Sequence, residues 1–416
     1  MISPSQEVEG MDNNDVVVFG IDVSSRKSNV CEMIGQDHVI KSYEISNDQA
    51  GFNILLNNLK VFAQKPEIIF EATGVYSERL QSFLDEYHFS YCRLNPLKAK
   101  QQLMRFRVNK TDKHDAYSLA NSQYIFHRQS EYQIIPIYKK LKSLGHYYDQ
   151  LTHDLVISKN RLHRVLQETF PDIEQLFATP KGENYWQCII KFTHPELVKT
   201  AGLDSITKQL TTLKGVGHHR ANYLAQRLLN LANATYPSVS VDFPQVVQAR
   251  DYAQRLITLT SKRKEVVTQM VAIAHQLEHD DLSILTSIPG ISSTTAVLLL
   301  GTLGDIRRFR NPNALNAFVG VDLRHYESGQ FIAADHISKR GNAMARKILY
   351  RTIGQIASAS HYHQCHIADY YAQKKKSSQS RSSKKIAIAA VHKLIRTIYH
   401  LIIYGQKYDY QLANHR

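Results

Sequence analysis

Within the first hundred residues, short β-branched apolar runs alternate with helical periodicity, and this alternation constrains the fold most strongly. Residues 16–22 (VVVFGID) form a continuous apolar run that ends in an acid, as expected for a buried strand. Two more strands are predicted directly after it, and then helix and strand alternate. The strands are expected over residues 28–34, 38–45, 67–71 and 90–94, and the helices over 48–63 and 77–87. This order predicts an α/β domain with a mixed sheet.

Two of the predicted strands end in an acid, and two further acids follow on a helix. Asp22 ends the first strand and Glu71 the fourth, whereas Asp112 and Asp115 are spaced to share one helix face. If the first and fourth strands are parallel neighbours, Asp22 and Glu71 meet at the edge where open α/β sheets bind ligands. Four carboxylates converging there could hold two Mg²⁺ ions about 4 Å apart and act on a phosphodiester. Taken singly, each acid could equally be a turn residue or a solvated surface group.

The chain is strongly basic, with a net charge of +14 over 416 residues. Such a charge indicates a nucleic-acid partner or another acidic surface. Basic residues surround the paired acids and could hold a polyanion; they are Arg105, Arg107, Lys110 and Lys113. A second basic stretch, residues 374–385, is either a solvated loop or a nucleic-acid contact, and we favour the contact.

Cysteine usage and hydropathy exclude several classes of protein. The four cysteines are scattered without a CxxC pair, which argues against a disulfide framework or a zinc ribbon and favours a reducing cytoplasm. We expect no membrane association, because no apolar run approaches the roughly 18 residues of a membrane span and no signal peptide is present. A zinc site is disfavoured as well, although metal-ligand residues gather at His361, His363, Cys365 and His366.

The length predicts two or three domains. We place them at residues 15–130, 131–280 and 281–404. The middle region contains two long helices, over residues 138–170 and 248–279, whose apolar stripes either pack within one subunit or form an intermolecular coiled coil. A helical insert at about 180–244 separates them, and its turn at residues 214–217 (KGVG) either binds phosphate or merely requires glycine. The last region is mostly α-helical, and residues 287–292 (SIPGIS) resemble a helix-hairpin-helix turn that presents N–H groups to DNA phosphate.

Three segments of the first domain, GIDVSS, FEATGVY and KTDKHDA, together resemble the RuvC-like domain of DEDD transposases of insertion sequences. These belong to the insertion sequence one-ten group, whose relatives are the Piv-type DNA invertases and bridge-RNA-guided recombinases. The resemblance covers residues 15–130 and implies a ribonuclease H-like fold. It also implies that the acids bind metal; they are Asp22, Glu71, Asp112 and Asp115.

Two C-terminal segments, HYESGQ and ISKRGN, are similar to the transposase domain of the same family. This similarity implies that Ser328 is the nucleophile. Lys339 and Arg340 would then hold the charge of the scissile phosphate. One departure affects the loop before the serine, since many relatives have proline where this chain has Leu323.

The resemblance implies a transposase or site-specific recombinase that cuts and rejoins insertion-sequence DNA by Mg²⁺-dependent attack of a serine on a phosphate. It also implies DNA partners at the element ends and target, a noncoding guide RNA, a homodimer or homotetramer, and a place at the nucleoid of a prokaryotic cytoplasm. One alternative is a Holliday-junction resolvase-like metal nuclease that uses water and has no role for Ser328. Another is a nucleic-acid-binding protein with a degenerate site.

Overall fold

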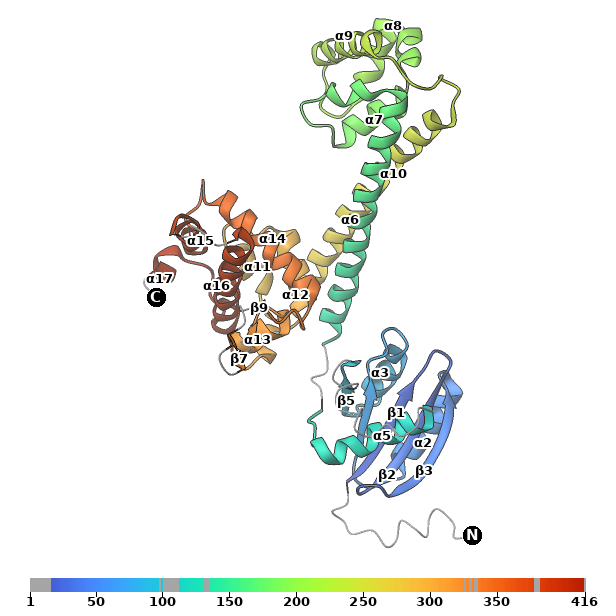
Figure 1. Cartoon of the computed structure of the whole chain (residues 1–416), viewed down its shortest axis with the longest axis vertical. Coiled ribbons are helices and arrows are strands. Elements are labelled where there is room, and N and C mark those ends of the chain that lie inside the picture. The colour runs from blue at the N-terminus through green and yellow to red at the C-terminus, as the bar shows by residue number, and fades with distance from the viewer. Residues whose placement is uncertain are drawn as a thin grey trace. The chain divides into compact units, whose positions relative to one another are not determined.

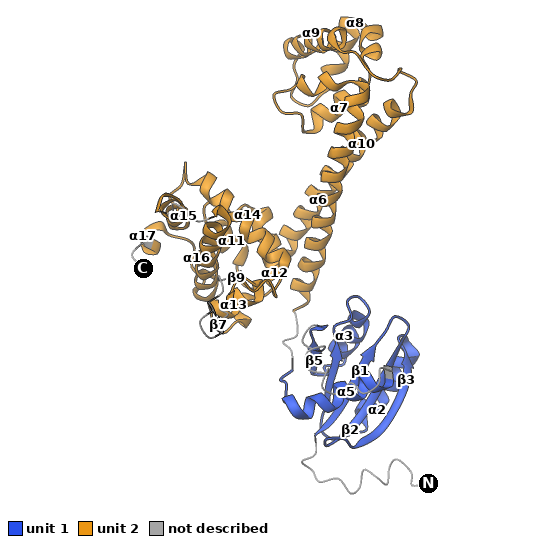
Figure 2. Cartoon of the chain, in the orientation of Figure 1, with its two compact units in different colours: residues 1–133 blue, residues 134–416 orange. Residues whose placement is uncertain are grey.

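The computed structural model describes residues 16–96, 99, 112–130, 135–324, 327–328, 331–332, 336–377 and 382–414. The chain divides into two compact units, which Figure 2 colours separately. Unit 1 comprises residues 1–133 and unit 2 comprises residues 134–416. Unit 1 corresponds to the predicted α/β domain, and unit 2 contains both the predicted helical middle and the C-terminal region.

Unit 1 is built on a five-stranded mixed sheet, as the sequence predicts, and the strand order is β3-β2-β1-β4-β5 (Figure 1). The first three strands form an antiparallel meander, and β4 and β5 continue the sheet in parallel to β1. The strands are β1 (Val17–Val23), β2 (Lys27–Ile34), β3 (Val39–Ser46), β4 (Glu67–Glu71) and β5 (Tyr91–Leu94).

Helices cover both faces of this sheet, and successive side chains of β1 point to opposite faces. Phe19 and Ile21 enter a core formed with α2 (Gln49–Lys60) and α3 (Ser77–Glu86). Val18 enters a separate core formed with α5 (Asp112–Phe126). Because side chains alternate along a strand, Gly20 and Asp22 share the α5 face with Val18.

Gly20 is the point where α5 crosses β1. A Cβ atom built on Gly20 would lie 2.2 Å from the Ala116 carbonyl oxygen and 2.5 Å from the Ala120 nitrogen. Real Cβ contacts do not come so close, so only glycine allows this helix to approach the strand. The glycine two residues before Asp22 therefore sets the distance between β1 and the helix that carries the paired acids.

Unit 2 contains two long helices that pack side by side, α6 (Pro136–Thr169) and α10 (Pro244–Ala274). The second begins and ends earlier than residues 248–279. It begins at Pro244, because proline suits the first helical turn, where its missing N–H is not needed. The predicted stripe is buried within the unit: Leu256, Val266 and Met270 are at most 4% exposed. The structure thus favours intramolecular packing over the intermolecular coiled coil for these residues.

The predicted insert forms a helical cap between α6 and α10 (Figure 1). Its core combines Trp186, Leu210 and Leu224 with Leu162 of α6 and Leu256 of α10. The cap consists of η3 (Pro171–Gln175), α7 (Glu183–Lys191), α8 (Pro195–Leu210) and α9 (His218–Ala234).

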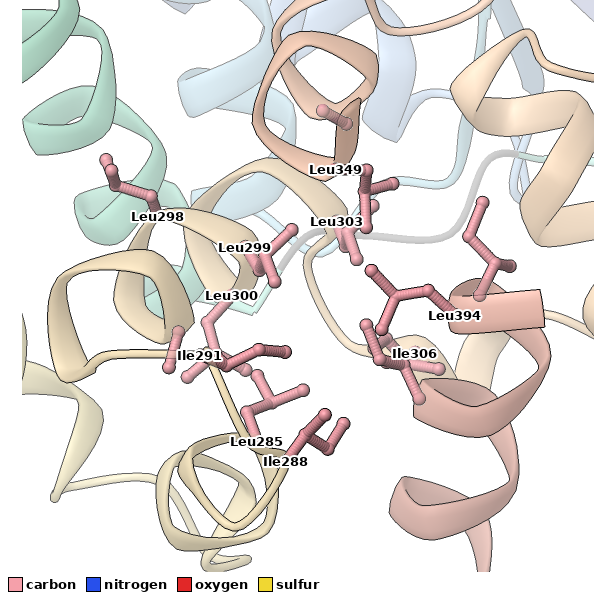
Figure 3. Packing of buried hydrophobic residues seen from close by; sticks show 14 of the residues in the cluster. Leu285, Ile288, Ile291, Leu298, Leu299, Leu300, Leu303, Ile306, Leu349 and Leu394 are labelled. Atoms are coloured by element: carbon pink, nitrogen blue, oxygen red, sulfur yellow. The ribbon is translucent and has the colours of Figure 1, made fainter. Parts of the chain in front are cut away.

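The C-terminal part of unit 2 is mostly helical and surrounds α12 (Ser293–Leu303). Figure 3 shows Leu299 and Leu303 of α12 facing Leu349 and Leu394 in one continuous core. The other helices are α11 (Asp281–Thr286), η4 (Ile306–Arg308), α13 (Pro312–Val319), α14 (Ala343–Ala359), α15 (His366–Ser377), α16 (Ser383–Tyr404) and α17 (Tyr410–Asn414). The short strands are β6 (Leu323–Arg324), β7 (Glu327–Ser328), β8 (Phe331–Ile332) and β9 (His336–Ile337).

One expectation about hydropathy needs correction. By length and composition α16 could cross a membrane, with a mean hydropathy of 1.5 over its most apolar window. Half of that window is buried within the unit. Leu394 and Ile398 are completely buried in the C-terminal core, so the apolar residues of α16 have a packing role in the fold.

The turn at residues 287–292 has a packing role too. Gly290 has φ +90°, and an added Cβ would lie 2.6 Å from the Ile356 Cα on α14. Ser292 caps α12 by accepting a hydrogen bond from the Thr295 N–H. Glycine is thus needed for close packing at this turn, whereas a phosphate contact at the turn stays a prediction.

Candidate functional site

The register of the sheet places Asp22 and Glu71 next to each other. β1 and β4 are parallel neighbours, as the prediction required, and Ile21 pairs with Phe70. One residue further on, Asp22 and Glu71 occupy adjacent positions at the carboxyl ends of their strands. Both belong to the α5 face, because Val18 of β1 and Ile69 of β4 contact α5 in the same core.

The paired acids begin the helix that covers this face. The Tyr124 hydroxyl, near the end of α5, donates to the Val16 and Met33 carbonyl oxygens at 2.7 and 2.8 Å. Since Val16 precedes β1, α5 runs antiparallel to β1 and begins at the edge where Asp22 and Glu71 lie. Asp112 precedes Ala116 by about 6 Å of helix, which matches the roughly 6.6 Å of strand between Gly20 and Asp22. Asp112 therefore starts α5 approximately level with Asp22.

The carboxylates suit a hard divalent ion, because Mg²⁺ and Ca²⁺ prefer oxygen ligands. Asp22, Glu71 and Asp115 are each partly buried. The side chain of Asp112 lies outside the described residues. Among the side chains that are described, no group of three or more His, Cys, Asp or Glu residues is arranged to hold a metal ion. The structure thus places the acids on one face and edge of the sheet, without a formed set of three ligands among those it describes.

The structure gives no support for a zinc site at residues 361–366, which the sequence already disfavours. His366 is 6% exposed, and its imidazole hydrogen-bonds to the Tyr408 hydroxyl at 2.8 Å and to the Thr397 hydroxyl at 3.3 Å. Burial lowers the pKa of His366 to about 4, so the ring is neutral near pH 7. Both ring nitrogens already have partners in the core of unit 2.

Of the four basic residues predicted beside the acids, only one is described. Lys113 is exposed on the first turn of α5, next to the paired acids. Arg105, Arg107 and Lys110 lie outside the described residues. A cation on this turn can contact a phosphate held at the acidic edge.

Ser328 is the last residue of β7, in a small hairpin of unit 2. β7 and β8 are antiparallel, with Ser328 opposite Phe331. Ser328 therefore belongs to the last paired position of β7 in this hairpin. The side chain of Ser328 lies outside the described residues, as do residues 325, 326, 329 and 330. Leu323, which stands where many relatives have proline, pairs with Ile337 in the β6–β9 ladder. Leucine at this position is therefore compatible with strand pairing.

The ISKRGN segment forms an anchored turn before α14. Ser338 donates a hydrogen bond from its hydroxyl to the Asp322 carboxylate, and the Lys339 N–H donates to the Gly320 carbonyl oxygen. Asn342 caps α14 by accepting from the Met344 and Ala345 N–H groups. These bonds fix the backbone while the side chains of Lys339 and Arg340 stay exposed. The two cations are thus presented on a rigid turn.

A basic groove of about 1360 Å³ lies beside this turn, between β6, β9, α14, α15 and α16. None of its described lining residues is acidic. The eight cationic side chains that line it are Lys339, Arg346, Lys347, Arg351, Lys374, Lys376, Lys384 and Lys385. We refer to this feature as the basic groove.

Sequence reasoning missed the contribution of α14 to the basic groove. Arg346, Lys347, Tyr350 and Arg351 follow i, i+4 spacing and so share one helix face. This spacing could have predicted a basic face on α14. It could not have predicted the lysines on the other side of the groove, which come from the separate 374–385 stretch. Lys347 also forms an ion pair with Asp149 of α6 at 2.5 Å, which ties the groove wall to the long helix.

Comparison with known proteins yields matches to both units. A transposase family model of the DEDD type matches residues 19–171, and a model described as the transposase IS116/IS110/IS902 family matches residues 282–372. The transposase for insertion sequence element IS1111A from Coxiella burnetii is 38% identical over 71 residues, which are 17% of this chain and 20% of that protein.

Two further relatives cover more of the chain. An insertion element IS110 uncharacterized 43.6 kDa protein from Streptomyces coelicolor is 23% identical over 49% of this chain and 49% of its own length. The pilin gene-inverting protein of Moraxella bovis is 22% identical over 94% of this chain and 97% of its own length. The chain thus spans about a fifth and about half of the first two relatives and nearly all of the third.

Proposed function

Since this chain belongs to the DEDD transposases of the IS110 type, a family that moves or inverts DNA segments, we propose that it cuts and rejoins DNA by Mg²⁺-dependent attack of Ser328 on a phosphodiester. The observation that carries the metal-dependent part is the geometry of unit 1. The parallel register of β1 and β4 and the antiparallel course of α5 bring the positions of four acids to one edge of one sheet face. They are Asp22, Glu71, Asp112 and Asp115.

The acids would hold Mg²⁺, which when bound lowers the pKa of a nearby hydroxyl and stabilises negative charge on a phosphate and its leaving oxygen. The chain's own residues have separate tasks. In the first step a bond forms between the Ser328 Oγ and phosphorus, and the bond from phosphorus to one DNA oxygen breaks. The hydroxyl proton passes to water or a carboxylate, and the DNA oxygen leaves with the electron pair and is protonated. Lys339 and Arg340 stabilise the phosphate charge during the attack.

Rejoining is the reverse reaction with a different DNA strand. A hydroxyl of that strand attacks the phosphorus of the phosphoserine, a new phosphodiester forms, and the serine is released. Strand exchange therefore requires several active sites, and we propose a homodimer or homotetramer. The partners are the DNA of the element ends and target, with a noncoding RNA as the guide. The four cysteines are free and buried, which suits the reducing cytoplasm proposed for the protein.

The test of the nucleophile uses labelled DNA that carries the ends of the element, analysed on denaturing gels. The parent protein should yield a protein-linked strand, and Ser328→Ala should yield none while still binding the DNA. Ser293→Ala, which removes an exposed hydroxyl from the same unit, is the matched control and should behave like the parent. An adduct that persists in Ser328→Ala assigns the attack to another residue. Cleavage by the parent without any adduct favours the nuclease that uses water.

The test of the acids uses Asp115→Asn, which keeps the shape of the side chain and removes its charge. We expect loss of Mg²⁺-dependent cleavage with DNA binding retained. Asp154→Asn on α6, outside unit 1, is the control and should cleave normally. A parent protein that binds DNA but shows no Mg²⁺-dependent chemistry would instead support the degenerate-site alternative.

A further inference from the structure

The basic groove has the charge and size for a polyanion. Eight cations and none of the described acids line a space of about 1360 Å³. Pockets for small molecules measure roughly 300–1,000 Å³, so this space is larger than such a ligand needs, and its described charged side chains are all cationic. The side chains of Arg351 on α14 and of Lys384 and Lys385 on α16 are exposed. They can therefore follow a chain of phosphates along the groove.

Two tyrosines lie among these cations. Tyr350 of α14 is 38% exposed. Tyr370 of α15 is partly buried, and the Nζ atoms of Lys393 and Lys374 lie 5.2 and 5.6 Å from its ring centroid. An exposed ring between cations is the arrangement on which unpaired bases stack while their phosphates are neutralised. A duplex keeps its bases inside the helix, so it cannot use such a ring.

The start of α16 adds a further anion-binding element. Lys384 and Lys385 lie in its first turn and line the groove. Within the described residues, Ser382 at the cap position makes no side-chain hydrogen bond to this turn. The N–H groups at a helix start carry partial positive charge and bind phosphate well. Here that helix start supplements the lysines.

We propose that the basic groove holds a single-stranded segment of nucleic acid, with a base stacked on Tyr350 and phosphates on Arg351 and the start of α16. The inference rests on the proposed function and deepens it. The strands β6 and β9 border the groove and flank the hairpin of Ser328 in the chain, which connects the groove to the proposed nucleophile in sequence. The segment is either cleaved DNA or guide RNA, because both carry the same phosphates and stacking faces.

The experiment measures binding of the full-length protein to fluorescent probes by anisotropy. The probes are a single-stranded DNA, an RNA of the same sequence, and a DNA duplex of equal length. Tyr350→Leu, which removes the aromatic ring but keeps an apolar side chain, should weaken binding of a single-stranded probe roughly five- to hundred-fold and leave the duplex unchanged. Tyr350→Phe should bind as the parent does. Tyr362→Leu, at a tyrosine that is 87% exposed elsewhere in unit 2, is the control and should have no effect.

The phosphate contacts are tested with Arg351→Ala combined with Lys384→Ala. This double variant should reduce the salt slope of single-strand binding by about 1.4, since each contact contributes about 0.7. Lys407→Ala, at an exposed lysine outside the groove, should leave the slope unchanged.

Dependence on Tyr350 with either the DNA or the RNA probe supports the proposal and identifies the source of the strand. Equal weakening of duplex and single-strand binding, or no effect of Tyr350→Leu on any probe, overturns it. The outcome is separate from that of the proposed function. A parent protein that forms no adduct but binds single strands through Tyr350 contradicts the nucleophile and supports the groove. A parent protein that forms the adduct but binds single strands without Tyr350 supports the nucleophile and contradicts the groove.

Discussion

Replacing Gly20 by alanine tests whether α5 positions the acids of unit 1. The new Cβ would lie 2.2, 2.5 and 2.8 Å from the Ala116 oxygen, the Ala120 nitrogen and the Ala120 Cβ. Carbon atoms in contact are normally about 3.5–4.0 Å apart, so α5 has to withdraw by about 1 Å. All three contacted atoms belong to the backbone or to Cβ, and no side-chain rotation can relieve the clash. We therefore expect the upper end of the usual overpacking cost, about 3 kcal/mol.

This cost should appear in two measurements. The melting temperature of unit 1 should fall by roughly 10 °C, given a loss of about 3 kcal/mol in a domain of this size. Mg²⁺-dependent cleavage, assayed well below the new melting temperature, should fall by about 100-fold, since a misplacement of about 1 Å in a catalytic group has that effect. The second loss is expected because α5 carries Asp112 and Asp115, whereas β1 carries Asp22.

Gly51→Ala provides a matched control on the opposite face of the sheet. Its Cβ would lie 1.9 Å from the Ser46 oxygen, so it should also destabilise unit 1. The helix it disturbs, α2, carries none of the four acids. Folded Gly51→Ala protein should therefore cleave nearly as well as the parent. If folded Gly20→Ala protein cleaves as well as folded Gly51→Ala protein, α5 does not hold the acids in position.

Three further predictions concern packing, pH and salt. Met270→Ala should reduce the free energy of unfolding by about 2–4 kcal/mol without changing the sedimenting mass, because Met270 is fully buried within its own unit; a smaller assembly would contradict this. Burial lowers the pKa of His366 from its ordinary value of 6.5 to about 4, so the unfolded chain binds more protons between these values and stability is lost as the pH falls through them. His366→Gln should flatten the melting temperature over that range, and an unchanged pH profile would refute the assignment. Binding of duplex DNA should weaken with salt, by about 0.9 in log K per unit of log salt for each phosphate contact; salt-insensitive binding would exclude an electrostatic interface.

The strands and their terminal acids could be predicted because the relevant patterns are local. The β-branched run before Asp22 and the short strand before Glu71 are visible in a few residues each, and the mixed sheet follows from the order of such runs. The approach of α5 to Gly20 could not be predicted, since it depends on a helix nearly a hundred residues away. A glycine within a strand can mark the close approach of another backbone, but the sequence does not name the partner.

Ambiguity in the rest of the site has similar physical causes. The stripe containing Leu256 and Met270 has the same spacing whether its partner helix belongs to the same chain or to another copy. The basic groove combines Arg351 of α14 with Lys374 of α15 and Lys384 of α16, and only the packing of these three helices on one another brings them together. The sequence therefore leaves the lysines of the 374–385 stretch as either a solvated loop or a nucleic-acid contact, and it does not show that they face α14.

The packed helices α6 and α10 set the distance between the helical cap and the C-terminal core. The 31 residues of α10, at 1.5 Å per residue, extend about 46 Å. Because the chain leaves through α6 and returns through α10, equal insertions or deletions in both helices change the span without altering either end. Removing seven residues from each, about two turns, would shorten the span by roughly 10 Å and keep the same faces in contact. Related chains could thus acquire a different reach by paired changes in length alone, while the helical cap and the C-terminal core keep their own sequences.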